Sequence, residues 1–408
     1  MIYSLGIKLY GLGIRVLAFF SPRIRAFYAA RSHWYEQLSF WRDQNKNLKK
    51  KVLCFHCSSL GEYEMAIPIL ANPSIRNEYY CVVTFFSPSG YNHSSLGIHF
   101  DAKFYLPLDT IQNMRQFTEA LNPSKFVFVK NDLWFNLIRE LNKQGITTYW
   151  INGKLKEGGF SSGLGKALLK NLRYFEKCFV QDQTTSAILK KNNIDAIITN
   201  DLRYDRSIML RTSYTPMPLI KEFKGKLKIL IAGSSWPDEE AMICKTYMDV
   251  MSEFKLLIVP HDVSAKHIHE IKERFEAFDV ALWTDSDEEI VKSNVLVINK
   301  IGILSNLYQY ADIAFIGGAF GKGLHNILEA ATAGMPIITG PNTKNFPEVS
   351  YFKQAEVLFE VNNASELQAV LNRVTSNPQE LQRMKDYSRL LVESKTGSTA
   401  QIVQCILD

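Results

Sequence analysis

The chain has 408 residues, of which 46% are hydrophobic and 12% aromatic, and its formal net charge is +6. This length is typical of about two domains, and the composition excludes wholesale disorder and fibrous or low-complexity structure. Six cysteines are too few for a disulfide scaffold of this size, which indicates a reducing compartment. The closest pair, Cys54 and Cys57, is interpreted as packing at a strand end, because no second pair completes a zinc site.

The positive charge is concentrated at the N-terminus. Residues 1–51 hold ten basic and two acidic residues, a net charge of +8 (10 − 2), so the remaining residues sum to −2. The same segment is rich in aliphatic and aromatic side chains, which a solvated nucleic-acid-binding arm would not carry. It has neither the roughly 20 mostly apolar residues of a spanning helix nor the cleavage site of a signal peptide.

Lys8 and Arg15 are seven residues apart and would share one face of a helix, with apolar residues around the rest. This pattern favours a helix in a membrane interface, where the arginines that follow it meet anionic phospholipid headgroups. The alternative is a first helix packed on the globular body. We expect membrane association and set residues 1–48 apart as a membrane-associated segment.

Beyond Lys51, short β-rich runs alternate with helical patterns, which predicts βαβ units and parallel sheets. The strands expected in a first lobe are 51–55, 80–85, 125–129, 147–151, 178–181 and 196–199. Those expected in a second lobe are 228–232, 255–259, 280–283, 295–298, 313–316, 336–339 and 357–359. The final stretch, from about residue 365, is helical in pattern.

We therefore predict an α/β chain of two Rossmann-like, doubly wound lobes facing a cleft, the first at 49–205 and the second at 227–408. Residues 206–226 contain Pro216 and Pro218 without clear periodicity and are interpreted as a linker. In doubly wound sheets, ligands bind beyond the carboxyl ends of the strands. The segments that follow each strand are therefore where a site is expected.

Three polar segments follow strands of the first lobe. The first, at 56–62, allows a tight turn into a helix near Glu62, with backbone N–H groups free to hold an anion. A carboxylate there is also a common complement to the helix dipole. The second and third segments begin at Asn131 and Asn152. Because the carboxyl ends of parallel strands share one edge, we expect the three segments to converge.

The second lobe opens with a strand, a Gly-Ser turn at 233–235 and Pro237 at the first position of a helix. The hydroxyls and amides of that turn suit a phosphate group. His261 follows the next strand and is either a structural histidine or a donor to an anion of the ligand.

The segment at 317–329 carries the strongest signal. A glycine-rich loop containing Lys322 leads into a helix that we expect to open at His325 and Asn326, with Glu329 one turn further on. Glycines allow close approach of the backbone, the helix start and Lys322 supply positive potential, and a carboxylate can accept hydrogen bonds from ribose hydroxyls. This is the chemical outline of a nucleotide-sugar site. The alternative is a glycine-rich turn that only lets a helix pack closely on the sheet.

With these segments, the chain resembles the 3-deoxy-D-manno-octulosonic acid (Kdo) transferases of lipopolysaccharide and lipid A synthesis. These are membrane-associated glycosyltransferases with two Rossmann-like lobes, of the GT-B type. Besides the basic and aromatic N-terminus, the resemblance rests on six segments in the right order and spacing: 59–62, 132–134, 151–155, 201–205, 232–237 and 317–329.

The resemblance implies transfer of Kdo from CMP-Kdo to the lipid A precursor, with inversion at the anomeric carbon and without a metal or other cofactor. It implies attachment to the cytoplasmic face of the inner membrane and Glu62 as the general base. The donor-binding residues it implies are Gly233, Ser234, Ser235, Trp236, His261, Gly318, Lys322, Gly323, His325, Asn326 and Glu329. The residues expected on the acceptor side are Ser59, Gly61, Asp132 and Lys154.

The chain departs from the family pattern in the first lobe. Lys130 stands where an acidic residue is usual, and Phe135 stands where proline is usual. Two other functions therefore stay open. One is a different GT-B glycosyltransferase, or an epimerase, acting on a UDP-sugar; the other is a membrane-bound scaffold that has kept the fold and lost catalysis.

Overall fold

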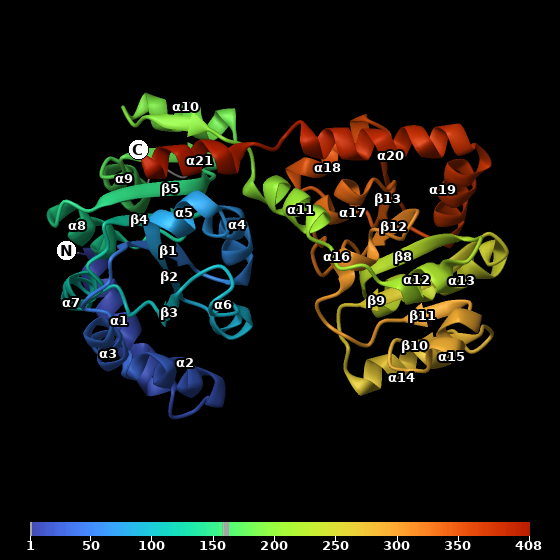
Figure 1. Ribbon diagram of the computed structural model, residues 1–408, viewed down its shortest axis with the longest axis horizontal. Coiled ribbons are helices and arrows are strands. Elements are labelled where there is room, and N and C mark those ends of the chain that lie inside the picture. Colours follow the sequence, from blue (N-terminus) through green and yellow to red (C-terminus); the bar gives the residue numbers. More distant parts are fainter. Residues whose placement is uncertain (1, 157, 159–162) are drawn as a thin grey trace. The chain divides into compact units, whose positions relative to one another are not determined.

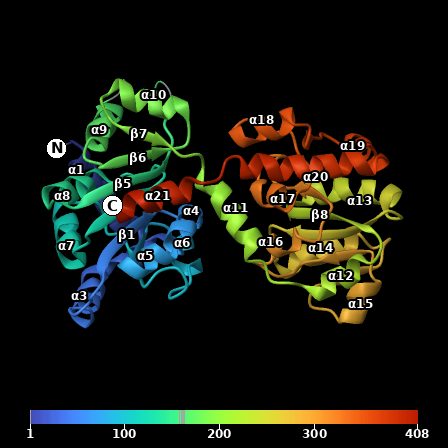
Figure 2. The same ribbon diagram turned by 45° about the horizontal axis from the view of Figure 1, so that its top comes forward.

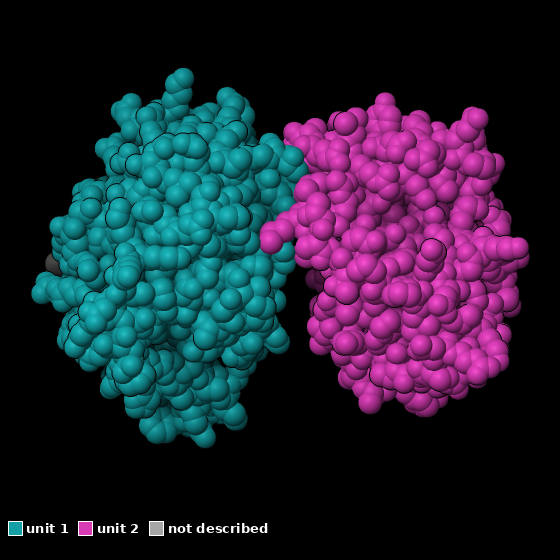
Figure 3. Space-filling model, viewed as in Figure 1, with its two compact units in different colours: residues 1–206, 396–408 teal, residues 207–395 magenta. Residues whose placement is uncertain are grey.

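The structure, a computed structural model, describes residues 2–156, 158 and 163–408. It consists of two compact units (Figures 1 and 3). The first unit contains the chain up to Arg206 together with Thr396–Asp408, and the second contains Ser207–Lys395. Each unit is built on one parallel sheet of seven strands, with helices packed on it.

The sheet of the first unit has the order β3-β2-β1-β4-β5-β6-β7. Its strands are β1 (Lys51–Cys57), β2 (Tyr79–Phe85), β3 (Ala102–Tyr105), β4 (Lys125–Val129), β5 (Thr147–Gly153), β6 (Lys177–Val180) and β7 (Ala196–Ile198). Its helices are α1 (Ile2–Leu17), α2 (Pro22–Ser32), α3 (Trp34–Gln44), α4 (Leu60–Leu70), α5 (Pro73–Glu78), α6 (Pro88–His93), α7 (Ile111–Leu121), α8 (Phe135–Lys143), α9 (Gly163–Leu172), α10 (Gln183–Lys191) and α21 (Ser398–Leu407).

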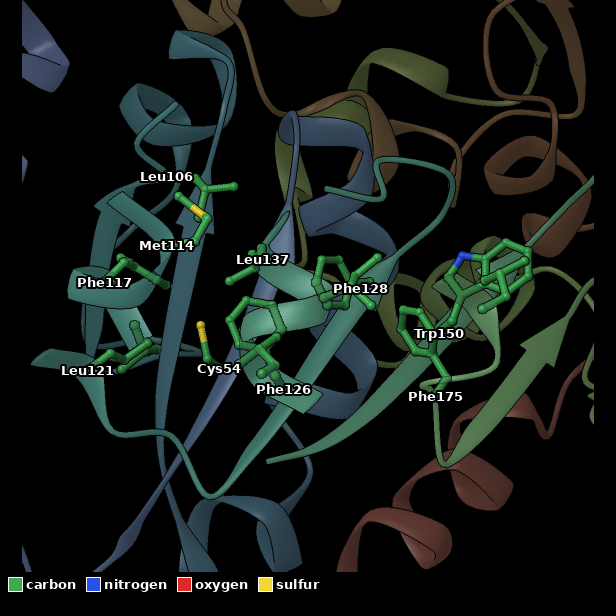
Figure 4. Packing of buried hydrophobic residues seen from close by; sticks show 14 of the residues in the cluster. Cys54, Leu106, Met114, Phe117, Leu121, Phe126, Phe128, Leu137, Trp150 and Phe175 are labelled. Carbon is green, nitrogen blue, oxygen red and sulfur yellow. The ribbon is translucent and has the colours of Figure 1, made fainter. Parts of the chain in front are cut away.

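The core of the first unit lies between this sheet and the helices that cover it (Figure 4). Phe126, Phe128 and Trp150 are fully buried on neighbouring strands, and the rings of Phe126 and Phe128 have centroids 4.8 Å apart. Parallel strands covered on both faces read as continuous apolar runs. That pattern is what made β1, β4 and β5 recognisable in the sequence.

The sheet of the second unit has the order β10-β11-β9-β8-β12-β13-β14. Its strands are β8 (Lys228–Ser235), β9 (Phe254–Pro260), β10 (Val280–Leu282), β11 (Val295–Val297), β12 (Ile313–Ile316), β13 (Ile337–Thr339) and β14 (Leu358–Glu360). Its helices are α12 (Pro218–Lys224), α13 (Pro237–Val250), α14 (Ala265–Arg274), α15 (Asp287–Lys292), α16 (Leu304–Leu307), α17 (Leu328–Ala333), α18 (Pro347–Gln354), α19 (Ala364–Ser376) and α20 (Pro378–Glu393). The helix α11 (Leu202–Thr212) joins the two units.

All thirteen predicted strands are present, and the prediction of two doubly wound α/β lobes is confirmed. The sequence analysis missed β3, a four-residue edge strand that contains Lys103. The stretch at 206–226 is not an irregular linker, because it holds the end of α11 and all of α12. Pro218 begins α12 at a position where proline is favoured, so it marks a helix start and not a break.

The C-terminal helix α21 belongs to the first unit, so the second lobe does not extend to residue 408 as predicted. The N–H of Gly397 donates to Asp205 over 2.9 Å, and the hydroxyl of Tyr79 donates to the carbonyl of Ile406 over 3.2 Å. Figure 2 shows α21 beside α4 and β5. The apolar side of this helix was visible in the sequence, but nothing local says which sheet it covers.

The N-terminal segment at 1–48 is also part of the first unit and not separate from it. The Tyr3 hydroxyl donates to Asp109 over 2.7 Å, Ile14 is buried, and Leu38 of α3 lies in the core. Among the described helices, none is both long and apolar enough to cross a bilayer. The structure therefore combines a helix packed on the body with an outer face that remains exposed.

Candidate functional site

The three polar segments of the first unit converge at the carboxyl ends of β1, β4 and β5, which are neighbours in the sheet. The side-chain amide of Asn131 donates to the carbonyl of Lys154 over 2.6 Å. The ammonium of Lys130 lies 3.9 Å from a carboxylate oxygen of Glu62. The predicted convergence is thus confirmed by contacts between all three segments.

Glu62 is fixed at the start of α4 by a capping box. Ser59 is the N-cap residue, and its N–H donates to Glu62 Oε2 over 3.0 Å. The Ser59 hydroxyl donates to the same carboxylate oxygen. The other oxygen, Oε1, faces Lys130 at 3.9 Å, which is too long for a hydrogen bond. The carboxylate is therefore held by one oxygen, while the other remains able to take a proton.

Beside it, a buried histidine anchors Asp132. His56, which is fully buried, places Nδ1 at 3.0 Å from the hydroxyl of Thr84 and Nε2 at 3.0 Å from Asp132 Oδ2. The indole N–H of Trp134 donates to the same oxygen over 3.1 Å. Burial alone would raise the pKa of Asp132, but its hydrogen bonds with His56 and Trp134 outweigh burial and lower it. The sequence analysis assigned no role to His56, although a histidine inside an apolar strand was a signal.

Two further residues expected on the acceptor side, Lys154 and Gly61, lie at the same edge of the sheet. The ammonium of Lys154 lies 3.9 Å from Asp182, so its charge is paired with the start of α10. At Gly61, an added Cβ would meet only Ser59 Oγ, at 3.8 Å. This is an ordinary van der Waals distance, so the space beside the Cα of Gly61 is open and packing within the protein does not require glycine there.

In the second unit, the loops after β8, β9 and β12 bring together one cluster of rings. The ring of Trp236 stacks on His261 with centroids 4.5 Å apart, and His261 stacks on His325 at 4.8 Å. The indole N–H of Trp236 donates to His325 Nε2 over 3.3 Å, and the ammonium of Lys322 lies 5.3 Å from the Trp236 ring centroid. Burial lowers the pKa of His325, which favours the neutral ring that can accept this bond. His261 is exposed, so it is not a buried structural histidine.

The glycine-rich loop needs glycine for steric reasons. Gly318 has a φ of +95°, and an added Cβ there would lie 2.2 Å from the carbonyl oxygen of Gly323. Its N–H donates to Glu239 Oε1 over 2.7 Å, while Oε2 of the same carboxylate accepts from the N–H of Trp236 over 3.0 Å. Glu239 thus ties the loop after β12 to the loop after β8. The sequence alone assigned Glu239 no role.

Burial raises the pKa of Glu239 to about 7, against the lowering effect of these two N–H donors. The carboxyl also lines a pocket of about 550 Å³ above the start of α13, together with Trp236, Phe320 and Lys322. Asp238 also lines the pocket, and the N–H groups of Gly318 and Trp236 are taken up by Glu239. A helix start and a lysine are features that hold phosphate groups. The pocket suits the anionic part of a nucleotide sugar.

The helix expected to open at His325 and Asn326 begins later, at Leu328. The side chain of Asn326 accepts from the N–H of Leu328 over 3.1 Å and donates to Glu329 over 3.1 Å. An asparagine that bonds the backbone two residues on forms a turn that competes with the helix. That turn keeps His325 outside the helix, where its ring joins the cluster.

The residues of the predicted Gly-Ser turn lie beside the pocket without lining it. The hydroxyl of Ser235 is buried and donates to Glu240 over 2.9 Å, and a Cβ on Gly233 would lie 2.4 Å from the Tyr308 hydroxyl. Ser234 has a φ of +53°, in the left-handed region. Within the described residues, no group of three or more His, Cys, Asp or Glu side chains is arranged to hold a metal ion.

Comparisons with known proteins find Kdo transferases and other glycosyltransferases. A model described as 3-deoxy-D-manno-octulosonic-acid transferase (kdotransferase) matches residues 32–206, and one described as glycosyl transferases group 1 matches residues 284–391. A 3-deoxy-D-manno-octulosonic acid transferase of Aquifex aeolicus is 26% identical over 358 residues, which cover 86% of this chain and 93% of that one. One from Haemophilus influenzae is 27% identical over 382 residues, covering 88% and 86%.

Among solved structures, UDP-GlcNAc 2-epimerase from Neisseria meningitidis, bound to UDP-GlcNAc, matches with a TM-score of 0.62 at 14% identity. The match covers 88% of this chain and 99% of the epimerase. At this identity the likeness shows the shared two-lobed fold alone. The sequence relatives, in contrast, align with most of the chain, including residues of both units. The first unit thus matches the Kdo transferase family model, Kdo transferases are similar in sequence to most of the chain, and the enzyme is a glycosyltransferase of the GT-B fold.

Proposed function

We propose that this enzyme transfers Kdo from CMP-Kdo to the lipid A precursor, with inversion at the anomeric carbon and without a metal. The observation that carries the proposal is the Glu62 carboxylate at the end of β1, held through Oε2 with Oε1 left for a proton. A general base must lie within hydrogen-bond reach of the proton that it takes. The sequence likeness to Kdo transferases supports the sugar, and the pocket in the second unit suits a nucleotide phosphate.

In the proposed reaction, Glu62 takes the proton of an acceptor sugar hydroxyl while that oxygen attacks the anomeric carbon of Kdo. The bond from this carbon to the CMP phosphate oxygen breaks, and its electron pair leaves with the phosphate. Lys322, the N–H groups at the start of α13 and the ring cluster would stabilise the leaving phosphate. Glu329 would hold the cytidine ribose.

The test is incubation of the full chain with CMP-Kdo and a tetraacylated lipid A precursor in detergent, with product mass measured directly. The expected product is heavier than the acceptor by one or more Kdo residues. Replacing CMP-Kdo by UDP-sugars should give no product. Transfer or epimerisation of a UDP-sugar, with no reaction of CMP-Kdo, would favour the alternative of a UDP-sugar enzyme.

We also propose that α1 attaches the enzyme to the cytoplasmic face of the inner membrane. One side of α1 packs on the first unit, whereas the other leaves large apolar side chains exposed. These are Leu5, Leu9, Leu12 and Val16, and Phe19 follows in the turn after the helix; all five are 51–78% exposed. A helix with an apolar outer face flanked by basic residues is typical of interfacial attachment.

Because Tyr3 and Ile14 pack on the body, substitution at exposed positions is a cleaner test than deletion of the segment. The triple variant Leu9→Ser, Val16→Ser and Phe19→Ser should lose most of its binding to anionic vesicles yet keep its CMP affinity. The matched control is Ile301→Ser in the second unit, which alters a side chain that is 79% exposed. Equal vesicle binding by all three proteins, wild type included, would show that attachment lies elsewhere.

A further inference from the structure

A basic pocket lies between α1, α2 and the loop that follows β3, apart from both clusters described above. Its volume is about 420 Å³, and Lys8, Arg15 and Arg31 all line it. No acidic side chain is among the residues of the described chain that line it. Figure 1 shows α1 and α2 side by side, and both helices contribute to the walls.

Arg31 is the deepest of the three cations, with only 7% of its surface exposed. Its Nη1 donates to the carbonyl of Phe27 over 3.0 Å and its Nη2 to the carbonyl of Phe86, while Nε is buried without a hydrogen-bond partner. The rings of Phe27, Phe86 and Tyr105 surround the guanidinium, with centroids 3.7–4.8 Å away. Rings and carbonyls bind a cation, but they do not neutralise it.

A buried cation is costly unless an opposite charge is near. Burial lowers the pKa of Arg31 to about 10, so the guanidinium is still charged at neutral pH. Among the described residues, no carboxylate forms a salt bridge with Arg31, Lys8 or Arg15. Lys8, Arg15 and Arg31 thus line one cavity with no acidic residue in its lining, and an anion there would balance their charge.

The position of the pocket indicates where the anion comes from. Leu12 lines the pocket and is 58% exposed, and it belongs to the apolar outer face of α1 with Leu9 and Val16. If a phospholipid phosphate lay in the pocket, the acyl chains of that lipid would lie beside the apolar outer face of α1. A soluble phosphate would gain nothing from that arrangement.

We propose that this pocket binds the phosphate of a membrane phospholipid headgroup, through Arg15 and Lys8 at its mouth and Arg31 at its base. The proposal rests on the membrane attachment proposed for α1 and adds a defined site to it. Attachment would then depend on a phospholipid phosphate bound in this pocket, and not only on the diffuse positive charge of the N-terminal segment.

The first test measures binding of the full chain to vesicles of phosphatidylcholine with and without phosphatidic acid. Arg15→Gln removes a charge from the pocket, and Arg23→Gln removes the same charge from an exposed position on α2 that does not line it. Loss of a charged hydrogen bond should weaken binding to the anionic vesicles by about tenfold or more. Loss of a diffuse surface charge should weaken it by about fivefold at most.

The second test uses calorimetry with a short-chain, soluble phosphatidic acid and with inorganic phosphate. The short-chain lipid should bind the wild type and Arg23→Gln, and Arg15→Gln should abolish the binding. Inorganic phosphate binding equally well would overturn the assignment to a lipid. A raised KM of Arg15→Gln for the acceptor in detergent without phospholipid would also overturn it, because the pocket would then serve the acceptor.

The two proposals fail in different ways. Equal losses in Arg15→Gln and Arg23→Gln, with no binding of the short-chain lipid, would refute the pocket while attachment stands. Absence of binding to any anionic vesicle would refute attachment by α1, and with it this function of the pocket. Folding of each variant is checked by circular dichroism and by its thermal unfolding midpoint, because Arg15 and Arg23 lie in the first unit.

Discussion

The two units carry clusters of different chemistry at equivalent places, beyond the carboxyl ends of their sheets. The cluster of the first unit consists of paired charges: Glu62 faces Lys130, and Asp132 is held by His56. The cluster of the second unit consists of stacked rings and glycines, with Trp236 at its centre. In the proposed function, one fold would serve two tasks, which differ in the side chains placed on the same strand ends.

The difference follows from what each task needs. A carboxylate that moves a proton needs a fixed position and an oxygen left available, which the capping box at Ser59 provides for Glu62. A site that holds a nucleotide phosphate needs close backbone approach and many N–H donors, which glycines and a helix start provide. We therefore expect substitutions in the first cluster to alter turnover and those in the second to alter donor affinity.

The largest effect is expected for Glu62→Gln. Glutamine keeps the capping box, in which Glu and Gln are interchangeable, but removes the basic oxygen. Turnover should fall by about 10²–10⁴-fold, the range of general acid–base catalysis. Ser59→Ala is the matched control, since it weakens the cap and leaves the carboxylate in place. A rate loss in Ser59→Ala as large as that in Glu62→Gln would mean that Glu62 acts only as a cap.

The next effect is expected for Gly318→Ala in the second cluster. The new Cβ would lie 2.2 Å from the Gly323 carbonyl oxygen, at a φ of +95°, so the loop must rearrange. CMP affinity, measured by calorimetry, should fall about tenfold or more. The control is Gly323→Ala, whose Cβ would meet nothing within 4 Å and which adds backbone strain alone. Equal losses of affinity in the two variants would show that strain, and not the blocked approach, is responsible.

A smaller effect is expected for Lys130→Met, which removes the cation facing Glu62. The side chain of Lys130 is 44% exposed, and partly exposed ion pairs contribute about 0–1 kcal/mol. Turnover should therefore change by no more than about fivefold, with CMP affinity unchanged. Loss of activity comparable to that of Glu62→Gln would instead give Lys130 a direct part in the reaction.

The smallest effect is a pH dependence of stability from Glu239. Its pKa is raised by burial from 4.5 in the unfolded chain to about 7, so the folded state binds the proton more tightly. The stabilisation is full below pH 4.5 and is lost as the pH rises through about 7. Urea midpoints should therefore decline between about pH 4.5 and 7 and level off above that, and Glu239→Gln should flatten this decline. An unchanged slope in the variant would assign the titration to another group.

The sequence predicted the sheets well because apolar runs between turn signals are local features. It also predicted which loops converge, since parallel topology places neighbouring strand ends together. It could not predict hydrogen bonds between residues of different loops, such as that from the N–H of Gly318 to Glu239. Those bonds depend on the exact position of each loop above the sheet. The start of α17 was misplaced because the turn at Asn326 is decided by one side-chain hydrogen bond. The packing of α21 on the first unit is decided by tertiary contacts, and no local sequence pattern indicates it.

The division of tasks between the two clusters is tested most directly by measuring turnover and CMP affinity together in Glu62→Gln and Gly318→Ala. The account predicts a crossed pattern: Glu62→Gln loses turnover at unchanged CMP affinity, and Gly318→Ala loses CMP affinity while keeping turnover at saturating donor. A loss of CMP affinity in Glu62→Gln as large as in Gly318→Ala would contradict it, since one cluster would then serve both tasks.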